Sequence, residues 1–136
     1  MEQRIIAVDF DGTIVEDKYP DIGRERPFAF QTLKALQKKG FLLILWTCRA
    51  GATLDAAVEY CRGQGIEFYA INSNYPGEPY DADGMRKIEA DIYIDDRNYG
   101  GAPQWGEIFQ SLCPNTPLVP EKPKAGGLKK LFGRGG

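Results

Sequence analysis

Residues 4–17 read RIIAVDFDGTIVED, an apolar run that leads directly into two aspartates, a glycine and a threonine. Consecutive apolar residues that end at charge and glycine predict a short strand buried on both faces. The carboxylates of Asp9 and Asp11 follow at the point where this strand ends. The stretch therefore predicts a buried strand with two carboxylates at its carboxyl end.

Apolar runs of this kind recur along the chain and alternate with segments that have helical spacing. Further strands are predicted at residues 41–46, 66–71 and 91–94, and a fifth edge strand at 117–119. Helices are predicted at residues 27–40, 53–62, 85–90 and 104–112. Because the strands are apolar on both faces and alternate with helices, we expect an α/β fold of the three-layer, doubly wound type, with a parallel sheet covered on both sides.

The length and the charge distribution predict one domain followed by a tail. We expect a catalytic domain at residues 1–113 and a flexible basic tail, rich in proline, glycine and lysine, at residues 114–136. The tail has a net charge of +4 and the body one of −6. An adaptor that docks through this tail on nucleic acid or a membrane stays open as an alternative. The negative charge of residues 72–84 disfavours nucleic acid as a partner, and truncation of residues 114–136 tests for such docking.

The content of histidine and cysteine excludes several kinds of site. The chain has no histidine, so Ser–His and Cys–His catalysis and His-ligated metals are excluded. Its three cysteines have no CxxC spacing, which disfavours a disulfide framework or structural zinc and fits a reducing compartment. No apolar stretch reaches the length of a membrane span, and the first residues lack the features of a signal peptide. We therefore expect a cytoplasmic protein.

Polar side chains follow three of the predicted strands. Asp9 and Asp11 come after the first strand, Thr47 after the second, and Asp95 and Asp96 after the fourth. In open α/β sheets the ligand crevice lies outside the carboxyl ends of the strands, where the strand order reverses. If the first strand lies between the second and the fourth, all these side chains line one crevice.

The same residues resemble the motifs of a known family. VDFDGT at residues 8–13, LLILWTCR at 42–49, Lys87 and IYIDDRN at 92–98 resemble the four motifs of the haloacid dehalogenase superfamily of phosphohydrolases. The resemblance covers about residues 4–112 and is strongest to small bacterial members without a cap domain, described only as hydrolases. It implies a Rossmann-like core with the strand order 3-2-1-4, with room for a fifth edge strand.

The resemblance also implies a reaction and assigns roles to residues. It implies a phosphatase, a Mg²⁺-dependent phosphoric monoester hydrolase, in which Asp9 forms an aspartyl-phosphate and Asp11 is the general acid and base. The metal ligands that it implies are Asp9, Asp11, Asp95 and Asp96. The groups implied to bind the phosphoryl oxygens are Thr47, Lys87 and the loops at Phe10, Asp11 and Cys48. Ionised aspartates share such a site only when a cation is present.

Several residues near these motifs allow more than one interpretation. Arg49 and Asn74 are candidate substrate contacts, and Arg49 could equally be a surface charge. Cys48 is expected to be a small buried residue, and the two tryptophans are expected in the core. Lys87 is preferred over its neighbour Arg86, and one of the two residues Asp95 and Asp96 could be no more than a turn or helix cap.

The spacing between the motifs leaves no room for a cap domain, so we expect an open site. Its substrate would be a phosphorylated small molecule or a bulky phosphoester, and a second copy of the chain could act as a lid. Residues 72–84 form the expected local flap. A calcium loop and a receiver domain are excluded, because the glycine spacing and the position of the acidic strand end do not fit them. A non-catalytic or regulatory phosphate-binding protein on the same fold stays open as the alternative function.

Overall fold

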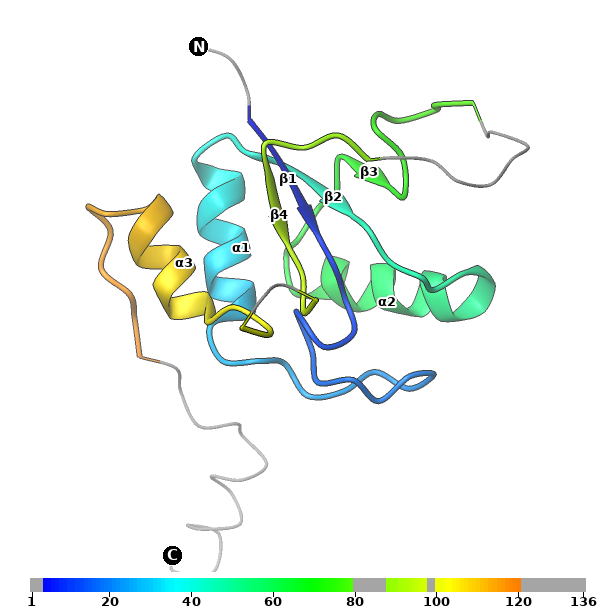
Figure 1. Cartoon of the computed structure of the whole chain (residues 1–136), viewed down its shortest axis with the longest axis horizontal. Coiled ribbons are helices and arrows are strands. Elements are labelled where there is room, and N and C mark those ends of the chain that lie inside the picture. The colour runs from blue at the N-terminus through cyan, green and yellow to red at the C-terminus, as the bar shows by residue number, and fades with distance from the viewer. Residues whose placement is uncertain (1–3, 80–87, 98–99, 121–136) are drawn as a thin grey trace, which may run out of the picture.

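The computed structural model describes residues 4–79, 88–97 and 100–120. Its strands are parallel and form one sheet in the order β3-β2-β1-β4 (Figure 1). The strands are β1 (Ile5–Val8), β2 (Leu42–Leu45), β3 (Ala70–Ile71) and β4 (Ile92–Ile94), and the helices are α1 (Ala29–Lys38), α2 (Gly51–Gly63) and α3 (Trp105–Leu112). The expected α/β class and the expected strand order are confirmed.

Strand β1 lies in the middle of the sheet, with β2 on one side and β4 on the other. Its residues Ile6, Ala7 and Val8 are fully buried, as an apolar run without alternation predicts. The strand order reverses beside β1, because the chain passes from β3 at one edge to β4 at the other. The carboxyl ends of β1, β2 and β4 therefore meet at one end of the sheet, where such folds bind ligands.

One face of the sheet packs against all three described helices. Helix α1 contributes Phe30, Leu33 and Leu36, which are spaced by three residues and so lie on one side of the helix. Helices α1 and α3 lie side by side against this face (Figure 1). The large core contains residues from every helix and from three strands: Ile6, Val8, Phe30, Leu33, Leu36, Leu43, Leu45, Ala57, Cys61, Ile94, Trp105 and Phe109.

The opposite face of the sheet carries a smaller apolar cluster. Because side chains alternate along a strand, Ala7 and Ile44 point away from the large core. In the part of the chain that the structure describes, they pack with Ala70 and Ile88, while Tyr69 and Ala90 lie against them. Half of the helix expected at residues 85–90 lies outside the described residues, and its described half, 88–90, is not helical.

Strand β3 is shorter than the sequence predicts. Residues 66–71 are apolar apart from Glu67, but only Ala70–Ile71 form a strand. The start of the run instead completes helix α2, because the Ile66 N–H donates to the Cys61 carbonyl and Gly65 has a φ of +90°. Ile66 is thus a core residue at a helix end rather than a strand residue.

The edge strand expected at residues 117–119 does not form, and this segment packs on α1 instead. The Gln31 side chain donates to the Val119 carbonyl at 3.0 Å and accepts from the Val119 N–H at 2.8 Å. Leu118 packs against the large core. The first residues of the expected tail therefore lie against the domain, while residues 121–136 fall outside the described part of the chain. None of the helices in the described ranges combines the length and the apolar character that a membrane crossing requires.

Candidate active site

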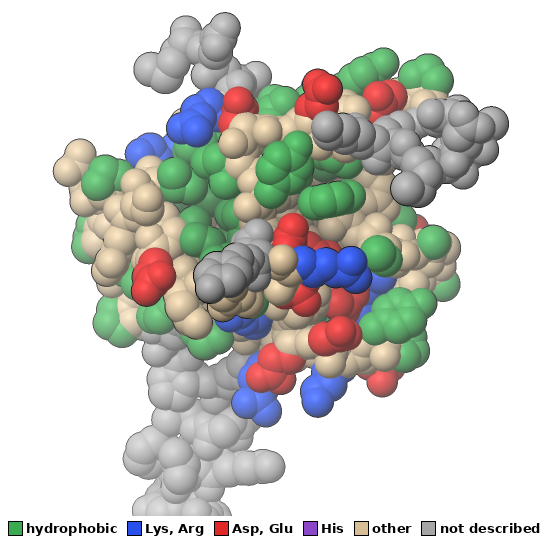
Figure 2. All heavy atoms as spheres, viewed as in Figure 1, with side chains coloured by type: hydrophobic (Ala, Val, Ile, Leu, Met, Phe, Trp, Pro, Cys, Tyr) green, Lys and Arg blue, Asp and Glu red, His purple; other side chains and the backbone are tan. Residues whose placement is uncertain are grey.

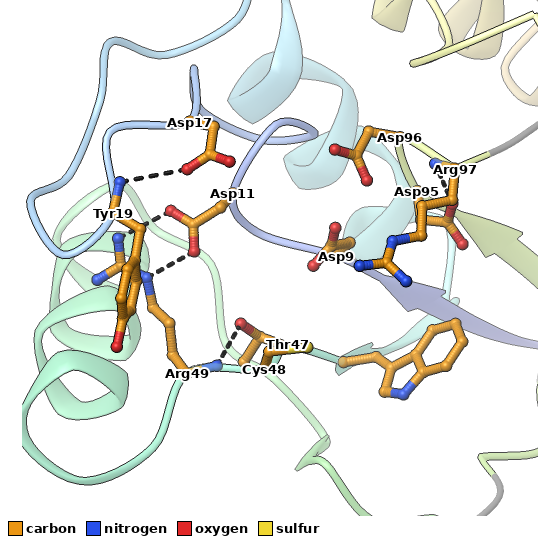
Figure 3. Close-up of a pocket in the computed structure, with 11 residues that line it drawn as sticks. Asp9, Asp11, Asp17, Tyr19, Thr47, Cys48, Arg49, Asp95, Asp96 and Arg97 are labelled. Atoms are coloured by element: carbon orange, nitrogen blue, oxygen red, sulfur yellow. Dashed lines mark hydrogen bonds and ion pairs between the residues drawn. The ribbon is translucent and has the colours of Figure 1, made fainter.

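A cavity of about 570 Å³ lies where β1, β2 and β4 end (Figure 3). It brings together side chains that are far apart in the sequence, and all of these were predicted to belong to one site: Asp9, Asp11, Thr47, Cys48, Arg49, Asp95 and Asp96. Four further lining residues were not predicted: Asp17, Tyr19, Trp46 and Arg97. Lys87 lies outside the described residues, so its role remains a prediction.

Asp9 continues β1 into the cavity and faces other carboxylates. Its backbone N–H donates to the Ile94 carbonyl at 3.0 Å, and its Oδ1 accepts from the Phe10 N–H at 2.8 Å. Burial raises the pKa of Asp9 to about 7; the Phe10 N–H opposes this rise, and the charges of Asp96 and Asp95 add to it. The site therefore disfavours the negative charge of Asp9 until a cation offsets the charges of its neighbours.

Asp96 reaches Asp9 across the backbone of Gly12. The two carboxyl groups interact, and this interaction adds to the rise in the pKa of Asp9. Gly12 has a φ of +81°, and a Cβ atom built there would lie 2.4 Å from Asp96 Oδ2. Glycine thus allows both the turn after Asp11 and the close approach of Asp96. Asp95 caps its own turn, because its Oδ1 accepts from the Arg97 N–H at 2.6 Å.

Asp11 points away from Asp9 and forms a two-point ion pair with Arg49 (Figure 3). Arg49 Nε lies 2.7 Å from Oδ2 of Asp11, and Nη2 lies 2.8 Å from Oδ1. The side chain of Arg49 is 1% exposed and that of Asp11 17%. Both carboxylate oxygens of Asp11 thus already accept hydrogen bonds within the protein, which departs from the expectation of a general acid directed at the reacting phosphate.

Arg49 is neither a surface charge nor free to contact a substrate. Its remaining donors bind the backbone carbonyls of Pro20 at 3.2 Å, Thr53 at 3.1 Å and Asp21 at 2.7 Å, so all five guanidinium N–H groups are used. The guanidinium also lies over the rings of Phe10 and Tyr19, at 5.0 and 5.2 Å. Through these hydrogen bonds Arg49 connects the loop before α1 to the start of α2.

Thr47 and Cys48 present polar groups at the end of β2. The Thr47 N–H donates to Asn72 Oδ1 at 2.8 Å, and the Thr47 hydroxyl oxygen accepts from the Arg49 N–H at 3.1 Å. Cys48 is exposed rather than buried as expected. Within the described residues, the backbone N–H groups of Asp11 and Cys48 have no protein acceptor. Both amides can therefore donate to a bound anion.

Asn74 does not reach the cavity. Its backbone N–H and its side-chain amide donate to Glu78 at 2.7 and 3.2 Å, and its side-chain oxygen accepts from the Glu89 N–H at 2.7 Å. The expected substrate contact at Asn74 is therefore replaced by a structural role between two loop segments. Asn72, with a φ of +51°, is the asparagine whose side chain supports the site, because it holds the Thr47 backbone.

Comparison with protein-family models and with curated proteins gave no match. Among solved structures, a conserved protein coded by a locus of Bacteroides thetaiotaomicron is 50% identical to this chain, with a TM-score of 0.73. The match covers 85% of this chain and 94% of that chain. The chain belongs to the same protein family. The family shares this fold, and since the Bacteroides protein is described only as conserved, the chemistry must be argued from the cavity.

The oxygen ligands around Asp9 fit a magnesium ion. In the described ranges no three acidic, cysteine or histidine side chains form a metal-ligand group. However, Mg²⁺ in proteins often takes only one or two carboxylates and completes its shell with waters and phosphate oxygens. The contact between Asp9 and Asp96, with Asp95 near, supplies those carboxylates. The carboxylate of Asp11 is held by Arg49 and is not directed at Asp9, so the place of Asp11 among the metal ligands stays a prediction.

Proposed function

We propose that this protein is a Mg²⁺-dependent hydrolase of phosphoric monoesters that works through an aspartyl-phosphate at Asp9. The observation that carries the proposal is the place of Asp9: it ends the central strand in a cavity, faced by Asp96 and Asp95 and near Thr47. A crevice at the carboxyl ends of parallel strands is the usual ligand site of such a fold.

Electrostatics explains why this acidic cavity needs a cation. A phosphomonoester is an anion and is repelled by a carboxylate nucleophile. Asp9 and Asp96 would hold Mg²⁺, with Asp95 beside them, and the bound ion would neutralise charge on the phosphoryl oxygens. Arg97, which also lines the cavity, adds a positive side chain that extends toward Asp9 (Figure 3).

Asp9 would act as the nucleophile. One of its carboxylate oxygens attacks phosphorus, and the bond from phosphorus to the leaving oxygen breaks, with its electron pair passing to that oxygen. Water then attacks phosphorus of the aspartyl-phosphate, which restores Asp9 and releases inorganic phosphate. The hydrogen bond from the Phe10 N–H to Oδ1 fixes the orientation of the carboxylate for the first step.

The groups around β2 would hold the transferred phosphoryl group. The Thr47 hydroxyl oxygen already accepts a hydrogen bond from the Arg49 N–H, so its own hydrogen remains to donate to a phosphoryl oxygen. The backbone N–H groups of Asp11 and Cys48 would donate to other phosphoryl oxygens. The Phe10 N–H, which had been expected to do the same, is used by Asp9.

The role of Asp11 depends on its ion pair with Arg49. As general acid and base, Asp11 would protonate the leaving oxygen and later take a proton from water. It must first leave Arg49, because both of its oxygens accept from that guanidinium. Asp11→Asn should slow turnover by about 10²–10⁴-fold if Asp11 transfers the proton. An unchanged rate would restrict Asp11 to holding Arg49.

The proposal is tested by screening phosphorylated metabolites with Mg²⁺, with the wild type beside Asp9→Asn. We expect turnover only in the wild type, with a loss of at least about 10³-fold in the variant because the nucleophile is gone. A chelator should abolish the wild-type rate. Full activity of Asp9→Asn, or indifference to the chelator, would contradict the covalent or the metal part of the proposal respectively.

A second candidate function is a phosphate-binding protein without turnover. It is favoured by the ion pair of Asp11 with Arg49, which withholds the expected proton donor. Such a protein would be stabilised by inorganic phosphate and Mg²⁺ against heat but would release no phosphate from any ester in the screen.

We also propose a cytoplasmic location and an open site that accepts small phosphorylated molecules. The location is supported by three free cysteines, which fit a reducing compartment. The open site is supported by the connections from β1 to β2 and from β2 to β3, each of which holds a single helix.

A further inference from the structure

Two exposed aromatic side chains lie beside the cavity. Trp46 lines the cavity and is 40% exposed, and Tyr93 is 42% exposed. Their rings meet edge to face, with centroids 5.8 Å apart. Figure 2 shows hydrophobic side chains bordering acidic ones on the face of the molecule in view. Trp46 was expected in the core, but it is partly exposed and pairs with a second exposed aromatic side chain at an acidic cavity.

The strand geometry places this aromatic pair on the same side of the sheet as the nucleophile. Along β1, Ala7 points away from the large core, and Asp9 is two residues further on, so it shares the direction of Ala7. On β2, Ile44 also points away from the large core. Trp46 is two residues further along the chain, so it shares the direction of Ile44. The hydrogen bond from the Trp46 N–H to the Val8 carbonyl continues the pairing of β2 with β1 to this level.

Tyr93 approaches from the other side of β1. It pairs in register with Ala7, as does Ile44, so Tyr93 and the β2 side chains flank one small alanine. Because the Ala7 side chain is small, the rings of Trp46 and Tyr93 contact each other above β1. The aromatic pair thus borders the end of β1 from which Asp9 extends, and Tyr93 supports the edge of the indole.

We propose that Trp46 is a specificity-determining residue and that the substrate is a phosphomonoester whose leaving group carries a flat aromatic ring. This inference rests on the proposed function. A phosphoryl group held at Asp9 would direct its leaving group toward the exposed wall of the cavity, where the indole offers a stacking surface. The cavity, at about 570 Å³, is of the size that binds a small organic ligand.

A matched pair of esters isolates the effect of the aromatic ring. Benzyl phosphate and cyclohexylmethyl phosphate both release a primary alcohol, so they differ mainly in the flatness and π-electrons of the ring. We expect wild-type kcat/KM to be about tenfold higher for benzyl phosphate, mainly through a lower KM. Trp46→Leu should remove this preference, and Trp46→Phe should restore most of it.

Tyr75→Leu is the matched control, because Tyr75 is 48% exposed but does not line the cavity. It should keep the preference for benzyl phosphate. A second arm identifies the source of the ring, by comparing adenosine 5′-monophosphate with ribose 5-phosphate. A Trp46-dependent preference for the nucleotide indicates a nucleobase, and a preference confined to benzyl phosphate indicates a simple aryl group.

The outcomes separate this inference from the proposed function. Equal rates on both ring types, in a reaction that Asp9→Asn abolishes, would overturn the inference and leave the phosphatase standing. The binding of benzylphosphonate and cyclohexylmethylphosphonate, which cannot be hydrolysed, gives a readout without turnover. A Trp46-dependent binding preference without hydrolysis of any ester would support the aromatic site and contradict the phosphatase. Equal binding of the two phosphonates would overturn the inference in that case too.

Discussion

Asp9 and Asp11 are separated by one residue, yet the protein surrounds them in opposite ways. On the Asp9 side, formed by Asp9, Asp95 and Asp96, carboxylates crowd together and the pKa of Asp9 rises to about 7. On the Asp11 side, formed by Asp11 and Arg49 with the loop that Arg49 holds, a buried guanidinium satisfies the carboxylate completely. The fold therefore pairs Asp11 with a buried cation of the protein, and we propose that Asp9 takes an external one, Mg²⁺.

The largest expected effect comes from removing the built-in cation. Arg49→Met should lower the free energy of unfolding by about 3–5 kcal/mol, because it leaves Asp11 with an unpaired and mostly buried charge. It also removes the hydrogen bonds to the carbonyls of Pro20, Asp21 and Thr53. Urea denaturation measures the change.

The double variant Arg49→Met with Asp11→Asn is the control for this first prediction. It removes both charges and should recover part of the lost stability. If Arg49→Met were within about 1 kcal/mol of the wild type, the value typical of exposed ion pairs, the Asp11 side would not be the anchor that its contacts indicate.

A smaller effect is expected from adding a methyl group at Gly12, between the Asp9 side and the Asp11 side. Gly12→Ala should cost about 1–3 kcal/mol, because it strains a φ of +81° and pushes Asp96 away from Asp9. Gly77→Ala is a matched control, since Gly77 has a φ of +79° and open space where its Cβ would lie. In thermal unfolding, Mg²⁺ should raise the Tm of Gly77→Ala as much as that of the wild type, and should raise the Tm of Gly12→Ala less. Equal behaviour of the two variants would mean that the approach of Asp96 to Gly12 has no role in metal binding.

The last expected effect is a pH dependence that belongs to the Asp9 side, and solvent screening reduces its size because Asp9 is only partly buried. Because the folded-state pKa of Asp9, about 7, lies above the ordinary 3.8, the folded protein keeps a proton that the unfolded chain releases. This contribution to stability is complete below about pH 4 and is lost as the pH rises toward 7. Without Mg²⁺, stability should fall between about pH 4 and pH 7, and Asp9→Asn should reduce the slope.

Asp55→Asn, an exposed substitution on α2, is the control for the pH series and should keep the wild-type slope. Urea denaturation at several pH values in the presence of a chelator provides the measurement. Identical slopes for the wild type and Asp9→Asn would show that burial and the charges of Asp96 and Asp95 do not raise the pKa of Asp9.

The sequence predicted the sheet well because its strands are short apolar runs that end at polar residues. The run before Asp9 and the run before Thr47 became β1 and β2, and the strand order followed from the resemblance of the motifs. The strand predicted at residues 66–71 was too long, because periodicity cannot show that the first residues of the run complete a helix. The prediction that Trp46 lies in the core was wrong for a related reason. Trp46 extends the apolar run of β2 one residue beyond the covered part of the sheet.

The convergence of the candidate site residues could be predicted, but their pairing could not. Asp11 and Arg49 lie 38 positions apart, and nothing in their spacing indicates which carboxylate the guanidinium takes. Tyr19 and Asp17 line the cavity from a loop without periodicity, so no sequence signal marked them. Arg97 directly follows the two aspartates after β4, and its adjacency to them was a signal that could have been used.

The most direct test of the account is a chemical search for the phosphoryl group on Asp9. The wild type is mixed with Mg²⁺ and an ester that it hydrolyses, quenched in acid during the first turnover, and mapped by peptide mass spectrometry. The account predicts one added phosphoryl group on the peptide that contains Asp9, and none in Asp9→Asn. Release of phosphate at the full rate without any phosphorylated protein, or with the label on another residue, would contradict it.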